Sequence, residues 1–213
     1  MLLAHISTAS TLAPFFLGLS KPRSLSTELK LLLILTGVSF TCDMAAIYHI
    51  ELKISPNNAG NAYSLAEFIL LVTIYYKAFD APKLARPFLI LSLFYVLFFI
   101  SNLFFLQQEK INSYSLVISS LVFIEFAVSF FYKLMKDLPT LEVYRLPMFW
   151  VNVAILVFFA GNLFLFTVSH YLVTTMKNDL MVYWTFHNFL GITENILFTV
   201  GFYMSSRPAE NPL

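Results

Sequence analysis

PFLILSLFYVLFFISNLFFL, residues 87–106, is a run of twenty residues that contains no charged side chain. An α-helix of this length rises about 30 Å, which is the thickness of the hydrocarbon core of a membrane. The composition of the 213-residue chain agrees, because 59% of its residues are hydrophobic and only 12% are charged. A soluble domain carries roughly twice that share of charge. The sequence therefore predicts an integral membrane protein.

Apolar stretches of similar length recur along the whole chain. None alternates apolar and polar residues with the period of two that is typical of barrel strands, so we expect helices. The predicted fold is all-α, a polytopic seven-transmembrane-helix bundle that forms a single domain over residues 1–213. The spans are predicted near 2–19, 30–50, 61–79, 87–106, 112–134, 147–170 and 180–204.

The distribution of Lys and Arg predicts how the spans are oriented, since short cytoplasmic loops carry an excess of positive charge. Ten cations alternate in register against three, which places the amino terminus outside and the carboxyl terminus in the cytoplasm. A signal peptide at 2–19 is disfavoured, because its cations would precede the apolar run and here they follow it. The ten are Lys21, Arg23, Lys30, Lys77, Lys83, Arg86, Lys133, Lys136, Arg145 and Arg207, and the three are Lys53, Lys110 and Lys177.

An internal echo links the spans. Asn102 and Asn162 each lie fifteen residues after a proline, Pro87 or Pro147, that opens a span, and Asp43 lies at a similar distance from the cytoplasmic end of the second span. This pattern predicts three like hairpins, spans 1 and 2, 3 and 4, and 5 and 6, with a closing seventh helix. Parallel repeats of this kind occur in transporters. Chance convergence of similar helix starts is the alternative.

Polar side chains gather at one predicted depth, in the outer half of the membrane. Intramembrane carboxylates usually face a bundle interior and mark function. No Lys or Arg lies deep in any span, so the acids, with Glu125 and Glu194 nearer mid-depth, must be protonated, hydrogen-bonded or neutralised by a cation. We predict an outward-opening ligand cavity, with interhelical hydrogen bonding as the alternative role. The candidate ligand-binding residues are Asp43, Glu67, Asn102, Asn162, His187, Asn188 and Glu194.

The seventh span carries its polar groups on one side. At 100° per residue, His187, Asn188, Gly191, Glu194 and Asn195 share a sector of about 120°, which should face the bundle. Gly191 would permit a close neighbour or leave room for a ligand. A retinal Schiff base is excluded, because this span contains no lysine.

A metal site is a further possibility at the same depth. Asp43, Glu67 and His187 could together bind a divalent metal such as zinc, although this set is inferred from depth alone. No other cofactor is predicted. The chain's lone Cys42 allows no disulfide within the chain.

Several stretches resemble a family of uncharacterised seven-helix membrane proteins of Bacteroidota. They are SFTCD (39–43), AYSLAEFILLVTIYYK (62–77), FWVNVAILVFFAGNLFLF (149–166) and FHNFLGITENILFTVGF (186–202). The resemblance implies a bacterial inner-membrane location and a seven-helix form, without an agreed activity. The helical blocks are also similar to membrane input regions of some bacterial histidine kinases, which favours a sensory role by analogy.

Three functions remain open on these grounds. The first is a receptor-like, sensory protein that signals through a cytoplasmic or membrane partner, because its predicted inner loops are short. The second is a lipid hydrolase, since SFTCD and GNLF faintly resemble lysoplasmalogenase-type enzymes, but Asn162 stands where a second Asp would be wanted. A ceramidase-like zinc enzyme would need closely spaced histidines, and no HxxxH occurs. The third is a small-solute transporter. We expect the lipid bilayer, and no nucleic acid, as a partner.

Overall fold

The computed structural model of the chain consists of helices throughout the residues that it describes. These are 2–20, 25–52, 54, 57–80, 82–106, 112–137, 142–175 and 180–205, and the side chains of 82–85, 166 and 168–183 are not described. The helices are α1 Leu2–Ser10, α2 Leu12–Ser20, α3 Thr27–Glu51, α4 Asn57–Phe79, α5 Pro82–Ser101, α6 Ser113–Asp137, α7 Pro147–Thr175 and α8 Leu180–Met204, with a π-helical turn η1 Asn102–Leu106 and a 3₁₀ turn η2 Val143–Arg145. The prediction of an all-α bundle is confirmed.

Six helical segments are long and apolar enough to cross a membrane. They comprise Leu2–Ser20, Thr27–Glu51, Asn57–Phe79, Arg86–Leu106, Ser113–Asp137 and the Pro147–Leu165 part of α7. Helix α8 has 25 residues, but the polar residues between His187 and Asn195 dilute its apolar character, and it is not among the six. The structure thus supports a polytopic helical membrane protein.

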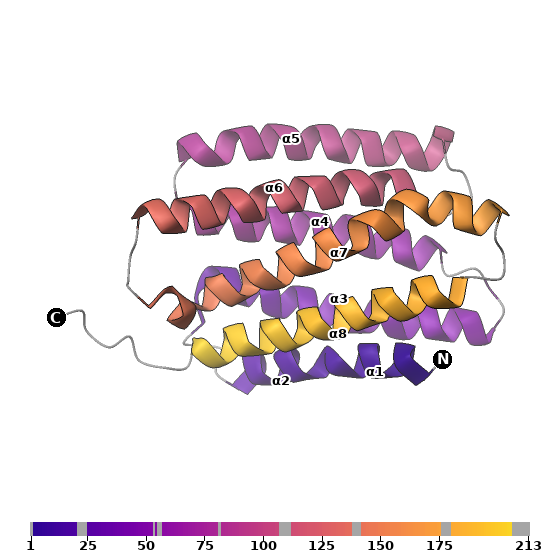
Figure 1. Cartoon of the computed structure of the whole chain (residues 1–213), viewed down its shortest axis with the longest axis horizontal. Coiled ribbons are helices and arrows are strands. Elements are labelled where there is room, and N and C mark those ends of the chain that lie inside the picture. Colours follow the sequence, from indigo (N-terminus) through magenta and orange to yellow (C-terminus); the bar gives the residue numbers. More distant parts are fainter. Residues whose placement is uncertain are drawn as a thin grey trace.

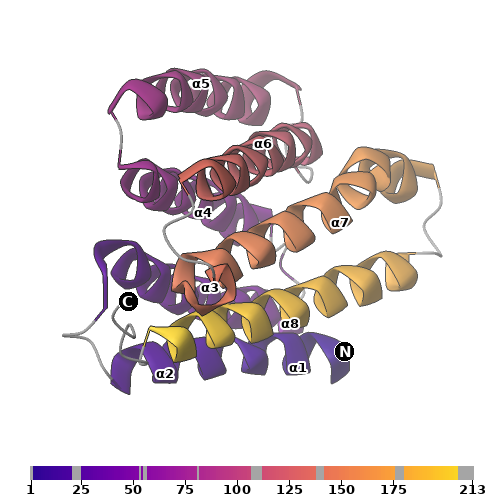
Figure 2. The same ribbon diagram turned by 60° about the vertical axis from the view of Figure 1, so that its left-hand side comes forward.

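The helices lie side by side with their long axes roughly parallel (Figure 1). From α3 to α8, successive helices run in opposite directions along the bundle. Helix α8 packs against α7 on one side and against α1 and α2 on the other, whereas α5 lies at an edge, against α4 and α6 (Figure 2). The start of α1 and the end of α8 therefore lie at opposite ends of the bundle.

The first predicted span is broken into two helices at Thr11. Pro14 causes the break, because it has no N–H to donate to the carbonyl of Ser10 and its ring crowds that carbonyl. Local hydrogen bonds hold the broken turn, with the Thr11 hydroxyl donating to the Thr8 carbonyl at 2.7 Å and the Ser10 hydroxyl to the Ser7 carbonyl at 2.6 Å. Beside this break, the Thr8 hydroxyl contacts Asp43 of α3 and the Ser10 hydroxyl contacts Asn195 of α8.

Aromatic side chains fill the contact between α4, α5 and α6. Phe68 stacks on Tyr95 with ring centroids 3.7 Å apart and lies 5.1 Å from Phe123, and Phe88 lies 4.4 Å from Phe126. Within lipid, helices gain little from the hydrophobic effect, so close packing must hold them together. Aromatic pairs supply about 0.5–1.5 kcal/mol each beyond simple burial. These rings account for the cohesion of this half of the bundle.

Glycines allow α8 to approach its neighbours closely. A Cβ added at Gly201 would lie 3.2 Å from the backbone oxygen of Pro147 and 3.2 Å from a Val151 methyl, both on α7. A Cβ at Gly191 would lie 3.1 Å from the Ser7 hydroxyl of α1. The prediction that Gly191 permits a close neighbour is confirmed. Small residues of this kind are typical of helix contacts in membranes.

Candidate functional site

Glu67 of α4 is a buried carboxyl group with a hydrogen-bond partner on its own helix. Its side chain is only 9% exposed, and the Tyr63 hydroxyl, one helical turn earlier, donates a hydrogen bond of 2.9 Å to Oε1. Because residues four apart lie on the same helix face, the sequence alone brings this phenol and carboxyl together. Tyr63 in turn forms a side-chain hydrogen bond with Ser39 of α3. The pair thus joins α4 to α3.

Two further carboxyl groups surround this pair. Asp43 of α3 interacts electrostatically with Glu67 and Tyr63, and Glu194 of α8 interacts with the same two residues. Asp43 also accepts a long hydrogen bond of 3.5 Å from Thr8 of α1. Both Asp43 and Glu194 remain half-exposed. We call Asp43, Glu67 and Glu194 the acidic cluster.

The electrostatics of the acidic cluster favour a bound positive charge or proton. Three ionised carboxylates repel one another strongly where the dielectric constant is low. The surrounding hydroxyl groups stabilise the ionised forms by donating hydrogen bonds, but they add no positive charge. In the described part of the chain, every Lys and Arg lies in the first or last five residues of a helix or in the turn η2. The cluster can therefore hold protons, or a cationic ligand, between helices α3, α4 and α8.

Asn162 and His187 form a separate pair between α7 and α8. His187 Nδ1 lies 2.8 Å from Asn162 Oδ1, while Asn162 Nδ2 donates to the Phe158 carbonyl at 2.9 Å. The imidazole ring also packs 5.8 Å from the Phe158 ring and 5.7 Å from that of Trp184. Asn162 is completely buried. This arrangement orients His187 and fastens the two helices together.

Asn102 fulfils an equivalent role between η1 and α6. It is completely buried, and its Nδ2 donates to Asn112 Oδ1 and to Ser115 Oγ, the latter at 3.2 Å. Asn102 and Asn162, two positions of the sequence echo, thus each hydrogen-bond to the following helix, at Ser115 of α6 and His187 of α8. Asp43, the third position, interacts electrostatically with Glu67 of α4. The echo therefore corresponds to two similar hydrogen-bonded contacts, between η1 and α6 and between α7 and α8.

The predicted set of site residues is accordingly divided among several helix contacts. Asp43, Glu67 and Glu194 come together, Asn162 pairs with His187, and Asn102 bonds to the start of α6. Asn188 turns back on its own helix, where Nδ2 donates to the Trp184 carbonyl at 2.6 Å. Depth alone predicted a shared layer, but helix packing decides which members of that layer meet.

The polar face of α8 contacts two neighbours. Asn195 Nδ2 donates to Ser10 Oγ of α1 at 2.8 Å, Glu194 interacts with Glu67, and His187 contacts α7. The predicted orientation of this face toward the bundle is confirmed. The proton donors and acceptors on α8 are thus used largely to hold α1 and α7.

The proposed metal ligands do not assemble in the described part of the chain. No group of three His, Cys, Asp or Glu side chains among these residues is placed to hold a metal ion. Asp43 lies near Glu67, whereas His187 is oriented by Asn162 on another helix contact. Asp43, Glu67 and Glu194 of the acidic cluster are likewise not among any such group in the described residues.

Glu125 is oriented differently from the expectation for an intramembrane acid. Its side chain is exposed on the surface of α6 and accepts a hydrogen bond of 3.1 Å from Ser129. Polar residues do not mark the outward face of α6, because four of its serines, Ser113, Ser115, Ser119 and Ser120, are buried. Packing by Phe123 and Phe126, both almost fully buried, turns Glu125 outward.

A buried polar contact in the other half of the bundle escaped the sequence analysis. The Tyr75 hydroxyl donates to Asn152 Oδ1 at 2.6 Å, and Asn152 Nδ2 donates to the Ala127 carbonyl at 3.0 Å. Both side chains are almost completely buried. An asparagine within the apolar run FWVNV was the available signal, because a buried amide needs partners. This contact joins α4, α6 and α7.

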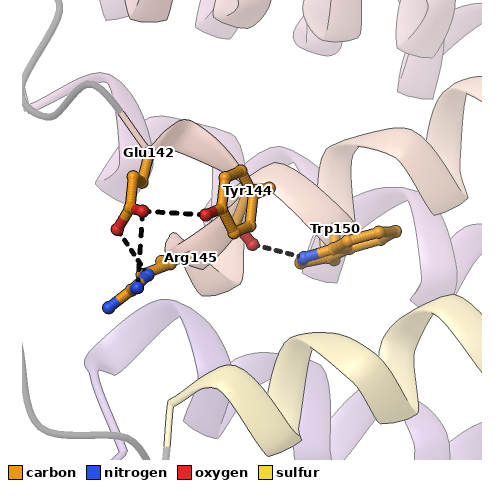
Figure 3. A network of polar contacts seen from close by, with 4 residues as sticks. All are labelled: Glu142, Tyr144, Arg145 and Trp150. Atoms are coloured by element: carbon orange, nitrogen blue, oxygen red, sulfur yellow. Dashed lines mark hydrogen bonds and ion pairs between the residues drawn. The ribbon is translucent and has the colours of Figure 1, made fainter.

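A polar network closes the connection between α6 and α7, as Figure 3 shows. Arg145 Nε lies 2.5 Å from Glu142 Oε2, the Tyr144 hydroxyl donates to Glu142 Oε1 at 2.9 Å, and Trp150 Nε1 donates to the Tyr144 carbonyl at 2.7 Å. Indole and guanidinium groups at a span end are typical of the membrane interface. Trp150 lies at such a span end, near the start of α7.

Comparison with known proteins adds no chemistry to this geometry. No protein-family model, curated protein or solved structure matches the chain. The resemblance to a Bacteroidota membrane family therefore stays a prediction.

Proposed function

We propose that the chain is a receptor-like membrane protein that binds a small organic cation at the acidic cluster. The observation that carries this proposal is the electrostatic interaction of Glu67 with Asp43 and Glu194, from three helices, with no Lys or Arg among the described residues acting on them. An ammonium group can accept hydrogen bonds from none of its neighbours but can donate to several carboxylates at once. The Tyr63 ring adds an aromatic surface that attracts cations.

An organic cation is a better candidate ligand for this cluster than a metal ion. The described part of the chain holds no group of three His, Cys, Asp or Glu side chains placed to bind a metal. The half-exposed Asp43 and Glu194 offer a route of access, while the buried Glu67 supplies the innermost contact.

The membrane topology belongs to the same proposal. We infer seven crossings, with α8 as the seventh, an external amino terminus and a bacterial inner-membrane location. An odd number of crossings is supported by the opposite positions of the start of α1 and the end of α8 (Figure 1). In this orientation the acidic cluster is nearer the external side. Ligand binding there would be transmitted to a cytoplasmic or membrane signalling partner.

Thermal stability in the presence of amines tests the binding site. The purified protein in lipid nanodiscs is heated with choline, putrescine or spermidine, and with glucose, acetate or zinc for comparison. A ligand at one hundred times its Kd stabilises the folded state by about 2.7 kcal/mol, which raises Tm by several degrees. We expect at least one amine to raise the Tm of the wild type, and Glu67→Gln to abolish this rise.

Glu125→Gln is the matched control, because it neutralises a membrane carboxyl group away from the cluster. This variant should retain the response to the amine. If no amine stabilises the wild type and Glu67→Gln simply melts earlier, the cluster is structural and the proposal is wrong. Stabilisation by zinc alone would favour the metal alternative.

Transport is a second candidate, favoured by the two similar hydrogen-bonded contacts of the η1–α6 and α7–α8 pairs. Internal repeats are common in transporters, whose substrate sites lie between them. Accumulation of a stabilising amine in proteoliposomes against a gradient would distinguish transport from sensing. A receptor would bind the amine without accumulating it.

A further inference from the structure

Glu125 is the central residue of the 25-residue helix α6, and its side chain is exposed on the outer surface of the bundle. Ser129, one turn further on, donates to its Oε1 at 3.1 Å. The other exposed ionisable side chains in the described spans lie toward the helix ends. An acid at this position would face hydrocarbon at the middle of the membrane.

A carboxyl group in hydrocarbon requires more than one hydrogen bond. It offers about four acceptor positions when ionised, and a donor as well when protonated. Ser129 satisfies one of these positions. Polar side chains within membrane helices usually face another protein surface for this reason. Among the described residues, none covers the exposed side chain of Glu125, so a second molecule would have to supply such a surface.

The residues around Glu125 form a surface suited to helix packing. Leu121, Val128, Tyr132 and Met135 are exposed on the same side of α6, between 51% and 73%. With Glu125 they follow one another at spacings of four, three, four and three residues. This alternation is the repeat by which two helices pack along a common seam. We call these five residues the α6 stripe.

We propose that the α6 stripe is a self-association surface, covered by the α6 stripe of a second copy of this chain. All copies share one orientation in a membrane, so a two-fold axis along the membrane normal brings equivalent residues together at equal depth. Glu125 then meets Glu125 of the second copy. Two carboxyl groups that share protons act as donor and acceptor for each other, and each remains hydrogen-bonded to its own Ser129.

Symmetry favours a second copy over a different partner. A two-fold contact presents a hydrogen-bonding group opposite Glu125 at the correct depth automatically, whereas another protein would need a polar group placed there independently. Membrane helices associate through just such polar side chains. This inference concerns another helix face than the acidic cluster and is independent of ligand binding.

Disulfide cross-linking in native membranes tests the surface directly. In a Cys42→Ala background, Val128→Cys should form a covalent dimer on mild oxidation, because Val128 lies beside Glu125 on the stripe. Phe94→Cys on α5 is the matched control, since Phe94 is 65% exposed but lies on another helix. It should remain monomeric under the same conditions.

The role of Glu125 is tested in the uncross-linked, full-length protein. Photobleaching of labelled protein in bilayers of increasing dilution measures the dimerisation constant. Glu125→Leu should weaken dimerisation on the order of tenfold, as expected for loss of an interhelical polar contact, whereas Glu125→Gln should retain it. A monomeric wild type, equal cross-linking at both cysteines, or an unchanged dimer in Glu125→Leu would each overturn the proposal. A monomer that instead binds a helix with a basic side chain would do the same.

Discussion

Asn152 stabilises the bundle through a contact that no neighbouring residue can replace. Substitution by Leu removes the acceptor of the Tyr75 hydroxyl, which is 1% exposed, and leaves that hydroxyl buried without a partner. We expect Asn152→Leu to lower the free energy of unfolding by about 1–3 kcal/mol. Reversible unfolding in mixed micelles measures the change.

A double variant shows whether the hydrogen bond between Tyr75 and Asn152 is the cause of this loss of stability. Tyr75→Phe removes the hydroxyl in advance, so a subsequent Asn152→Leu should cost clearly less than in the wild type. Asn188→Leu is a suitable control, because its amide bonds only a carbonyl of its own helix and should change stability by less than about 0.5 kcal/mol. Equal costs for Asn152→Leu with and without the Tyr75 hydroxyl would contradict this account.

The limits of sequence reasoning are clearest for single side chains. Glu67 and Glu194 could be predicted to face the bundle, because a charged side chain that faces hydrocarbon costs several kcal/mol of free energy. The same argument was wrong for Glu125, whose side chain is exposed on the surface of the bundle. The argument treats the bundle as isolated and does not consider a second molecule packed against it. Asn152 lies away from the outer layer of polar residues, so an argument from depth does not include it.

Helix α8 should be sensitive to side-chain volume at its contact with α7. Gly201→Leu would force a side chain against the Pro147 carbonyl and the Val151 methyl group, each 3.2 Å from the new Cβ. We expect a loss of about 1–3 kcal/mol in unfolding free energy, which is typical of overpacking. Thermal unfolding in detergent, followed by circular dichroism, would show a lower Tm.

Gly60→Leu provides the comparison within the same protein. No atom lies within 4 Å of a Cβ added at Gly60 on α4, and leucine has the higher helix propensity by up to about 1 kcal/mol. This variant should be neutral or stabilised. A similar decrease in Tm for both variants would show that close packing at Gly201 is not responsible.

At the level of elements, the sequence located the helices well and their interruptions poorly. The predicted seventh span, 180–204, coincides with α8, and the prediction 61–79 ends where α4 ends, at Phe79. Apolar run length determines such boundaries. The break at Thr11 was not predicted, although Pro14 could have indicated it, because composition averages over a span and a proline acts on one carbonyl.

The orientation of the whole molecule can be tested with reporters. We expect a fusion after residue 205 to be silent with a reporter that is active only in the periplasm, and active with a cytoplasmic one. Charge asymmetry is the physical reason, as Lys and Arg resist translocation. Fusion in the α3–α4 connection should give the reverse result. Periplasmic activity of the first fusion would contradict the orientation and the external position of the acidic cluster.

The arrangement of helices was only partly accessible from the sequence. The echo of Asn102 and Asn162 predicted repeated units, and each of these residues does contact the next helix. Which helices surround which, and that α5 lies at the edge, depends on ring packing such as Phe68 on Tyr95. Such packing depends on shape rather than on the apolar pattern, which is nearly uniform here.

The polar face of α8 has a consequence for biogenesis. A charged residue at the centre of a span opposes insertion by about 2.5–3.5 kcal/mol, and α8 carries Glu194 together with His187, Asn188 and Asn195. Within the bundle, Ser10 and Asn162 satisfy part of this polarity. We therefore expect α8 alone, placed in a host protein, to be translocated rather than inserted, whereas 86–106 alone inserts. Glycosylation mapping would measure both. Helix α8 would then insert into the membrane only when the helices synthesised before it are present to satisfy its polar groups.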